Sequence, residues 1–193
     1  MKIICYGDSN TYGYDAADLF GGRLPEHERW TEILSEALDC ETVNCGMNGR
    51  TVPRYPRQRD ADLRVITRNQ GCTLLIVMLG TNDLLLGFDA DDTAGHMRSF
   101  LKTLMRLMPE SRILLVAPPP SATIPEGCDA DFSYLASLYS ETASELGIDF
   151  ADAGQWGIEM AGDDVHFSPL GHRRFAQCIA DRIQSITLKG DRS

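Results

Sequence analysis

Four short stretches of the sequence carry groups that could together perform acyl transfer. Ser9 offers a hydroxyl in a run of small polar residues, and Asp163 and His166 offer a carboxylate and an imidazole three residues apart. Asn82 offers a side-chain amide, and Gly46 offers a backbone N–H that no Cβ obstructs. Acyl transfer from an ester needs an activated hydroxyl, a base, a group that orients the base, and donors for the oxyanion.

Each of these residues also has another interpretation. Ser9 could be a helix N-cap, and Asn82 could cap the helix that follows its strand. Asp163 and His166 could be a solvated loop pair. A metal-dependent hydrolase could instead use Asp163, Asp164 and His166 with water as the nucleophile. A third class is a non-catalytic binding domain that merely keeps the pocket.

The elements that must position these residues alternate between short apolar runs and amphipathic stretches. The apolar runs predict strands at residues 3–6, 41–44, 73–79, 113–117 and 148–150. The amphipathic stretches predict helices at residues 29–38, 60–69, 93–108, about 129–146 and from 168 onward. Pro53 and Pro56 are expected to keep the segment before the second helix extended. The alternation predicts a three-layer α/β/α fold with a parallel sheet, as a single domain over residues 1–193.

In such a fold the loops after the first, second, third and fifth strands can converge on one edge of the sheet. Open α/β sheets bind their ligands at this carboxyl edge. Ser9, Gly46, Asn82 and the segment 163–166 all fall in these loops. We therefore expect the four stretches to meet in one site.

Composition and charge narrow the class of partner. The chain has 193 residues, 43% of them hydrophobic and 24% charged, and its net charge is −10. A strongly negative protein is a poor ligand for nucleic acid or for an anionic membrane, so neutral small molecules are the favoured partners. No apolar run approaches the roughly 20 residues that span a bilayer. Because no signal peptide is evident at the N-terminus, we expect a cytoplasmic protein.

Other chemistry-bearing residues favour structural interpretations. The cysteines form no C-x-x-C pair, so reduced and mostly buried thiols are expected. These are Cys5, Cys40, Cys45, Cys72, Cys128 and Cys178. The remaining histidines are expected to be surface or packing residues: His27, His96 and His172. Asp89, Asp91 and Asp92 lack the ligand pattern of a calcium loop and predict a solvated helix start.

A basic stretch at residues 50–68 interrupts this acidic chain. Its six arginines predict a solvated or subunit-contact face, and they are Arg50, Arg54, Arg57, Arg59, Arg64 and Arg68. A sharper hypothesis is that Arg50 or Arg54 guides a polar or anionic acyl substrate to the sheet edge. Aromatic residues in the loops suggest a small site with aromatic walls, and they are Tyr12, Tyr14, Trp30, Tyr55 and Trp156.

The four stretches, in their order, resemble the SGNH (GDSL) hydrolase family. The blocks that carry the resemblance are Gly7-Asp8-Ser9-Asn10, Asn44-x-Gly46-x-x-Gly49, Gly80-x-Asn82-Asp83 and Asp163-x-x-His166. Thr11 stands where the G-x-S-x-G elbow of α/β-hydrolases has its second glycine, which points away from that fold. Segments 78–83 and 115–120 look most like the bacterial arylesterase and short-chain acyltransferase branch. Asn10 stands where the family commonly has leucine, so we expect it to affect local packing.

The resemblance implies a flavodoxin-like fold with five parallel strands and an open, shallow site that needs no metal or cofactor. It implies that Ser9 attacks the acyl carbon, His166 takes its proton, and Asp163 orients the imidazole. The oxyanion would be bound by the N–H of Ser9, the N–H of Gly46 and the amide of Asn82. Asp8 is expected to stabilise the turn, and Asp83 to be structural.

The predicted activity is that of a serine esterase that cleaves short-chain carboxylic esters through an acyl-enzyme intermediate. A carbohydrate O-deacetylase, a thioesterase or an acyltransferase would use the same triad, and the residues leave this choice open. A small neutral ester is the expected substrate. The resemblance also suggests a homo-oligomer.

Overall fold

The computed structural model of the chain describes residues 1–18, 20–69, 71–121 and 131–190. These residues form a five-stranded, all-parallel sheet in the order β2-β1-β3-β4-β5. Its strands are β1 (Lys2–Gly7), β2 (Glu41–Gly46), β3 (Leu74–Met78), β4 (Arg112–Ala117) and β5 (Asp149–Asp152). This is the flavodoxin-like order, whose topological switch point lies between β1 and β3.

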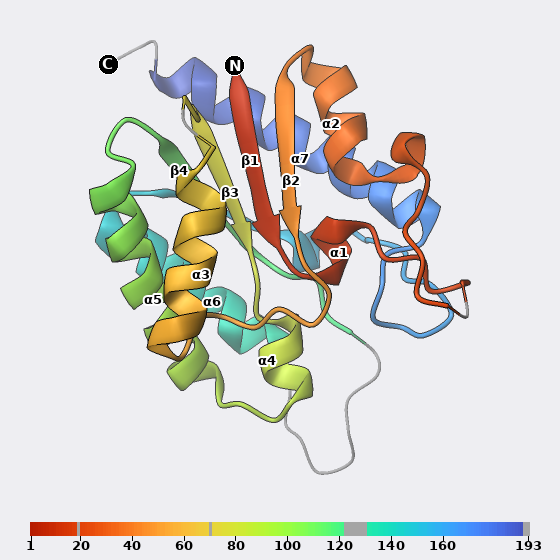
Figure 1. Ribbon diagram of the computed structural model, residues 1–193, viewed down its shortest axis with the longest axis horizontal. Helices are drawn as coiled ribbons and strands as arrows, with labels where there is room; N and C mark the ends of the chain where they lie inside the picture. Colours follow the sequence, from red (N-terminus) through yellow and green to blue (C-terminus); the bar gives the residue numbers. More distant parts are fainter. Residues whose placement is uncertain (19, 70, 122–130, 191–193) are drawn as a thin grey trace.

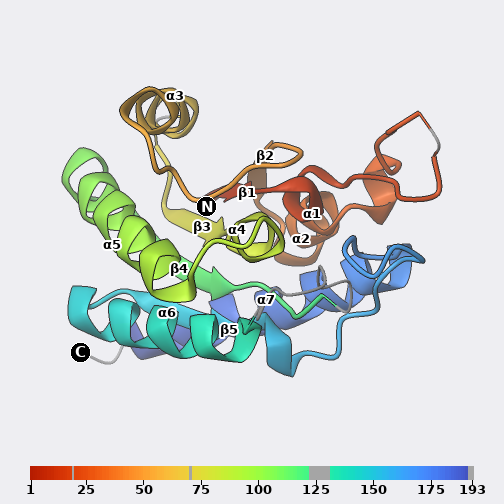
Figure 2. The same ribbon diagram turned by 90° about the horizontal axis from the view of Figure 1, so that it is seen from below.

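Helices cover both faces of this sheet, so the predicted three-layer architecture is confirmed (Figure 1). One face carries α2 (Trp30–Leu38) and α7 (Pro169–Gly190). The other carries α3 (Pro56–Thr67), α5 (Ala90–Leu107) and α6 (Phe132–Leu146), as Figure 2 shows. Short helices follow two strands at the carboxyl edge, α1 (Ser9–Tyr12) after β1 and α4 (Thr81–Leu85) after β3. Single 3-10 turns are η1 (Glu26–Glu28) and η2 (Ala153–Gln155).

The two cores explain why the central strands are apolar throughout. Successive side chains of a strand point to opposite faces of the sheet. Ile3 and Cys5 therefore pack into the core beneath α2 and α7, and Ile4 and Tyr6 pack into the core beneath α3, α5 and α6. All four side chains are completely buried. A strand covered on both faces needs apolar residues at every position, as β1 and β3 have.

The elements differ from the sequence prediction mainly at their ends. Strand β2 continues two residues beyond the predicted 41–44, as far as Gly46. Helix α3 begins at Pro56, which was expected to stay extended, because proline fits the first helical position, where no intrahelical N–H bond is needed. Helix α4 occupies a stretch expected to be a loop. Helix α6 begins at residue 132, and the predicted start at 129–130 lies outside the described residues.

Among the helices of the described ranges, none combines the length and apolar character that crossing a bilayer requires.

Candidate active site

Ser9 lies at the carboxyl end of β1, where the chain turns directly into α1. Asp8 is the N-cap of this helix, and its Oδ1 accepts the N–H of Asn10 at 2.9 Å. Ser9 is therefore the first helical residue, and the interpretation of Ser9 as the N-cap is wrong. Gly13 closes the single turn with a φ of 86°, a value that glycine adopts without strain. The tight turn holds the Ser9 hydroxyl at the sheet edge.

The structure brings Ser9, His166 and Asp163 into one hydrogen-bonded line. His166 Nε2 is 3.0 Å from Ser9 Oγ, and His166 Nδ1 is 2.5 Å from Asp163 Oδ2. Asp163 Oδ1 accepts the backbone N–H groups of Val165 and His166, both at 3.0 Å. His166 thus lies against the turn after β1, although Ser9 is 157 positions away from it in the chain.

Hydrogen bonds to Asp163 favour its ionised form. Burial raises the pKa of this carboxyl, but bonds from the His166 side chain and from the N–H groups of His166 and Val165 outweigh burial. The net result is a pKa below the ordinary value. A carboxylate facing Nδ1 suits an imidazole whose Nε2 is free to accept a proton.

Asn82 lies in the first turn of α4, at the carboxyl end of β3. The N-cap of α4 is Gly80, without a side-chain cap bond, so the capping interpretation of Asn82 is wrong. Asn82 Nδ2 donates to the carbonyl oxygen of Arg50 at 3.0 Å. An amide nitrogen carries two hydrogens, so this bond uses one of the two Asn82 donors.

Gly46 ends β2 and pairs in register with Gly7 of β1, two residues before Ser9. A Cβ at position 46 would lie 2.1 Å from the Tyr12 nitrogen, so only glycine lets α1 approach β2 this closely. The Gly46 N–H donates to Asn44 Oδ1 at 2.9 Å. In this arrangement the predicted oxyanion donor already has an acceptor, which sequence reasoning did not anticipate.

Asp8 is a buried carboxyl group beside Ser9, whereas Asp163 is exposed. Its Oδ2 has no hydrogen-bond partner within the described part of the chain. Burial raises the pKa of Asp8 to about 6, although the Asn10 N–H, His166 and Arg50 act in the opposite direction. Its cap bond confirms the predicted turn-stabilising role.

Arg50 is not placed to guide substrate, as one hypothesis supposed, because its side chain is buried. Its side chain is 4% exposed and donates to the carbonyl oxygens of Gly7, at 2.7 Å, and Cys45. Its Nε lies 3.2 Å from Asp62 Oδ1, and its guanidinium lies over the Tyr6 ring. Arg50 therefore stabilises the ends of β1 and β2 from a buried position and is not part of a solvated face.

Arg54 is similarly occupied. It pairs with the fully buried Asp83 at 2.9 Å and with Asp92, and it donates to Thr93 Oγ1 at 2.8 Å. Its guanidinium lies 3.9 Å from the centre of the Phe88 ring. With only 7% of the side chain exposed, Arg54 neutralises a buried acid and is not placed to select a substrate. The predicted structural role of Asp83 is confirmed.

The aromatic residues divide between the site and the core. The Tyr14 ring lies 4.4 Å from the His166 ring, so Tyr14 borders the triad. Trp30 is completely buried and donates its Nε1–H to the Asn10 carbonyl at 3.1 Å, which corrects its placement in a site wall. Trp156 packs on Phe175 beneath α7.

The lone histidines have packing or surface positions, as predicted. His172 lies in α7, is fully buried, and accepts the Trp30 N–H on Nδ1 at 3.3 Å. Burial and the nearby His166 and Arg29 lower the pKa of His172 to about 3. His96 Nε2 lies 3.4 Å from Asp92 Oδ1, one turn earlier in α5, and its side chain is partly exposed.

The remaining acids and cysteines match structural interpretations. Asp89 caps α5, accepting the N–H groups of Asp91 and Asp92, which confirms the predicted helix start. Across the described ranges no three His, Cys, Asp or Glu side chains are grouped as a metal would require.

Five cysteines are free thiols, and Cys5, Cys45 and Cys72 are buried. Cys128 lies outside the described residues.

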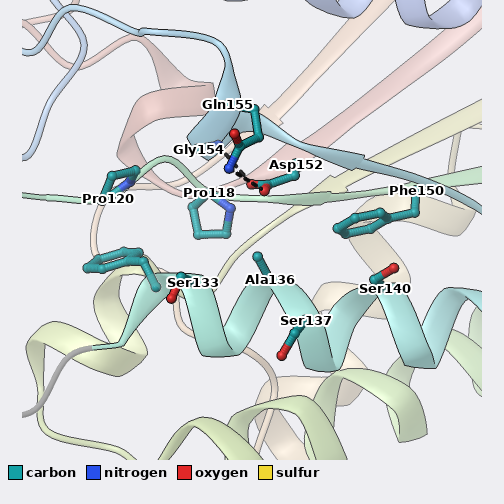
Figure 3. A pocket seen from close by; sticks show the side chains of 11 residues that line it. Pro118, Pro120, Ser133, Ala136, Ser137, Ser140, Phe150, Asp152, Gly154 and Gln155 are labelled. Carbon is teal, nitrogen blue, oxygen red and sulfur yellow. Dashed lines mark hydrogen bonds between the residues drawn. The ribbon is translucent and has the colours of Figure 1, made fainter.

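A separate cavity of about 410 Å³ lies between the first half of α6 and the ends of β4 and β5 (Figure 3). Pro118, Phe150 and Ala136 are among its lining residues. Asp152 is already bonded to the N–H of Gly154 and to the side chain of Gln155. No residue of the Ser9 line borders this cavity, so it is not the candidate site.

Sequence reasoning missed two polar contacts around Ser9. Asn44 holds the Gly46 N–H, and Asn10 binds the backbone on both sides of His166. The sequence did contain a signal for Asn10, because a polar amide stands directly after Ser9 where the family commonly has the apolar residue leucine. The expected effect of Asn10 on local packing therefore takes the form of hydrogen bonds.

The chain is similar to known proteins over most of its length. The model of the GDSL-like lipase/acylhydrolase family matches residues 5–174. Est24, a carbohydrate acetylesterase from Sinorhizobium meliloti, is 25% identical, with a TM-score of 0.84 over 96% of this chain and 99% of that one. The aryl esterase of M. smegmatis is 29% identical, with a TM-score of 0.81 over 95% of this chain and 98% of that one. No curated protein matches the chain.

Proposed function

Because the chain belongs to the GDSL-like lipase/acylhydrolase family and is a carboxylic ester hydrolase, we propose that it cleaves short-chain esters with a Ser9-His166-Asp163 triad. One observation carries the proposal. The Ser9 hydroxyl, both nitrogens of the His166 ring and the Asp163 carboxylate lie in a continuous line of hydrogen bonds, at 3.0 Å and 2.5 Å. Such a line is what removal of a proton from an alcohol requires.

The reaction then runs in two halves. Ser9 Oγ attacks the acyl carbon and gives its proton to His166 Nε2, which passes that proton to the departing alcohol as the ester C–O bond breaks. A water molecule next gives a proton to His166 and attacks the acyl-Ser9 carbon. The carboxylic acid leaves, and the proton returns from His166 to Ser9.

Three donors would stabilise the oxyanion of each tetrahedral intermediate. Ser9 is the first residue of α1, and N–H groups in a first helical turn have no acceptor within the helix. Asn82 has a second N–H beyond the one bonded to the Arg50 carbonyl. Gly46 would have to share its N–H between Asn44 Oδ1 and the oxyanion. We therefore expect Ser9 and Asn82 to contribute more than Gly46.

Covalent labelling of the hydroxyl tests this function. We expect an organophosphonate to modify Ser9 alone, as read by peptide mass spectrometry, and Ser9→Ala to lower kcat on p-nitrophenyl acetate by at least about 1,000-fold. Ser185→Ala is the matched control, because the Ser185 hydroxyl bonds to the Arg182 carbonyl and side chain within α7, far from Ser9 in the fold's helical layer. Substantial turnover by Ser9→Ala would refute the proposal.

The same assay separates the other two interpretations. A metal-dependent hydrolase that uses Asp163, Asp164 and His166 would lose activity to a chelator and regain it with added metal, whereas the proposed triad would be unaffected. A non-catalytic binder would hydrolyse neither p-nitrophenyl acetate nor other short esters.

An acetylated carbohydrate is the second substrate candidate, favoured by the similarity to the Sinorhizobium meliloti acetylesterase. A net charge of −10 supports a neutral substrate of either kind. Comparing kcat/KM for aryl acetates, acetylated sugars and a series of longer acyl chains identifies the preferred group. We expect acetyl esters to be cleaved fastest, and a preference for long acyl chains would contradict the short-chain assignment.

A further inference from the structure

We propose that Asn10 is a positioning residue that holds His166 within reach of Ser9. The inference rests on the proposed triad and goes beyond it, because Asn10 is not one of the reacting groups. Its side chain is 4% exposed and acts through the backbone that carries the imidazole.

The Asn10 side-chain amide hydrogen-bonds to the backbone on both sides of His166. Asn10 Nδ2 donates to the carbonyl oxygen of Val165 at 3.1 Å, and Asn10 Oδ1 accepts the N–H of Phe167 at 2.8 Å. The Asn10 side chain thus bonds to the backbone of Val165 and Phe167, much as a neighbouring strand would. The two bonds limit rotation and sliding of the backbone from which the imidazole projects.

Asn10 is itself fixed to the turn that carries the hydroxyl. It follows Ser9 directly, its N–H donates to Asp8 Oδ1 at 2.9 Å, and its carbonyl accepts Trp30 Nε1–H at 3.1 Å. Any movement of the Asn10 main chain also moves Ser9. The two hydrogen bonds of the Asn10 side chain therefore link the Ser9 turn to the His166 segment and help to keep Ser9 Oγ 3.0 Å from His166 Nε2.

The His166 segment needs such a connection because it belongs to a connecting loop. The segment between η2 and α7 carries internal bonds, including Ala161 N–H to the His166 carbonyl at 2.7 Å. Ser121 Oγ also donates to the Asp164 carbonyl at 2.8 Å, which ties the segment to the chain that follows β4. These bonds fix its shape and its link to the chain after β4, whereas the Asn10 bonds join it to the Ser9 turn. A displacement of about 1 Å between reacting groups can cost on the order of 100-fold in rate.

Leucine at this position could make neither bond. It would leave the Val165 carbonyl and the Phe167 N–H to find other partners, in a place where Phe167 is 1% exposed. The Asn10→Leu substitution is similar in shape to the native side chain, so it removes the hydrogen bonds without opening a large cavity.

A double-mutant cycle tests the inference. We expect Asn10→Leu to lower kcat on p-nitrophenyl acetate by about 10- to 100-fold with KM changed less than about twofold. In a His166→Ala background, the same substitution should change the residual kcat/KM by less than about twofold, because the group that Asn10 positions is gone. A general structural role would cause similar losses in both backgrounds and would overturn the proposal.

The cycle also separates this inference from the proposed function. If His166→Ala keeps full activity, the triad itself is wrong. If His166→Ala is inactive and Asn10→Leu has wild-type kcat, the triad stands and the positioning role is refuted.

Folding controls accompany the cycle. Thermal unfolding followed by circular dichroism should show each variant folded at the assay temperature. Should Asn10→Leu fail to fold, Asn10→Asp replaces it, because the carboxylate can still accept the Phe167 N–H but cannot donate to the Val165 carbonyl. Asn69→Leu is the matched control, since the Asn69 amide binds the Val65 carbonyl at 2.9 Å on α3, and its kcat should remain at the wild-type level.

Discussion

Asp163 uses its two oxygens for different tasks. Oδ1 accepts the N–H groups of Val165 and His166 and so sets the turn, whereas Oδ2 faces His166 Nδ1 at 2.5 Å. The first task shapes the loop, and the second selects the imidazole tautomer. A substitution that keeps the first task and reverses the second can separate geometry from proton placement.

Asp163→Asn is that substitution. The amide oxygen can keep both backbone bonds, but its NH₂ group would face Nδ1 and so favour a proton on Nε2, where the Ser9 proton must arrive. We expect kcat to fall on the order of 1,000-fold or more with little change in KM. The control is Asp164→Asn, because the Asp164 side chain is exposed and its backbone φ of 58° is tolerated by asparagine. A loss below about tenfold for Asp163→Asn would contradict the assigned role.

At this scale the sequence is informative where function depends on spacing within a few residues. Asp163 and His166 could be paired because three positions fit one turn, and Ser9 could be placed at a strand end because Gly7 follows an apolar run. The roles of Asn10 and Asn44 could not be predicted, because each depends on a backbone group brought near by folding. Arg50 and Arg54 were misassigned for the same reason. Only folding brings Arg50 to its buried partner Asp62 and Arg54 to its buried partner Asp83.

The Arg54 guanidinium joins the connection between β2 and α3 to both α4 and α5. Arg54 bonds to Asp83 in α4 and to Asp92 and Thr93 in α5. Asp83 also accepts the Val52 N–H at 3.0 Å, so this buried carboxylate fixes the connection twice. Burial raises the pKa of Asp83, and the bonds from Val52 and Arg54 oppose that effect.

Arg54→Met should therefore act on stability rather than on substrate choice. The methionine stem can still pack on Phe88, but Asp83 loses its counterion in a fully buried position. We expect the free energy of unfolding, measured with urea, to fall by about 3 to 5 kcal/mol. Adding Asp83→Asn should recover part of that loss. A KM that rises only for anionic esters, without loss of stability, would instead support substrate guidance by Arg54.

Element prediction worked where periodicity was strong and failed where a short element depends on its ends. The continuous apolar run at 73–79 identified β3, and the spacing from Trp30 to Leu38 identified α2. Helix α4 is five residues long and has too few positions to show a period. Pro56 was assigned to an extended segment because proline is compatible with both an extended chain and a first helical turn.

At the level of the whole molecule, the alternation of strands and helices predicts the layers, and the switch point explains why the site lies where it does. Ser9 follows β1 and Asn82 follows β3, on the two sides of that point. The site also brings two buried titratable groups of opposite type near His166. Asp8 caps the helix that begins with Ser9, and His172 in α7 receives the Trp30 N–H.

These two groups should affect stability with opposite pH dependence. The Asp8 pKa is raised from 3.8 to about 6, so between these values the native state holds a proton that the unfolded state has lost. Its contribution to the free energy of unfolding therefore falls as pH rises through this range. The His172 pKa is lowered from 6.5 to about 3, so the unfolded state holds the extra proton and stability rises with pH.

Between about pH 4 and pH 6 the two contributions cancel in the wild-type protein, since each amounts to about 1.4 kcal/mol per pH unit. Removing either group should reveal the pH dependence that the other gives to the free energy of unfolding. Urea unfolding across this range should show Asp8→Asn gaining stability over the wild type as pH rises, because the buried charge is absent. His172→Asn should lose stability relative to the wild type over the same range, whatever its constant packing cost. Parallel curves for the wild type and both variants would mean that neither group titrates differently in the folded and unfolded states.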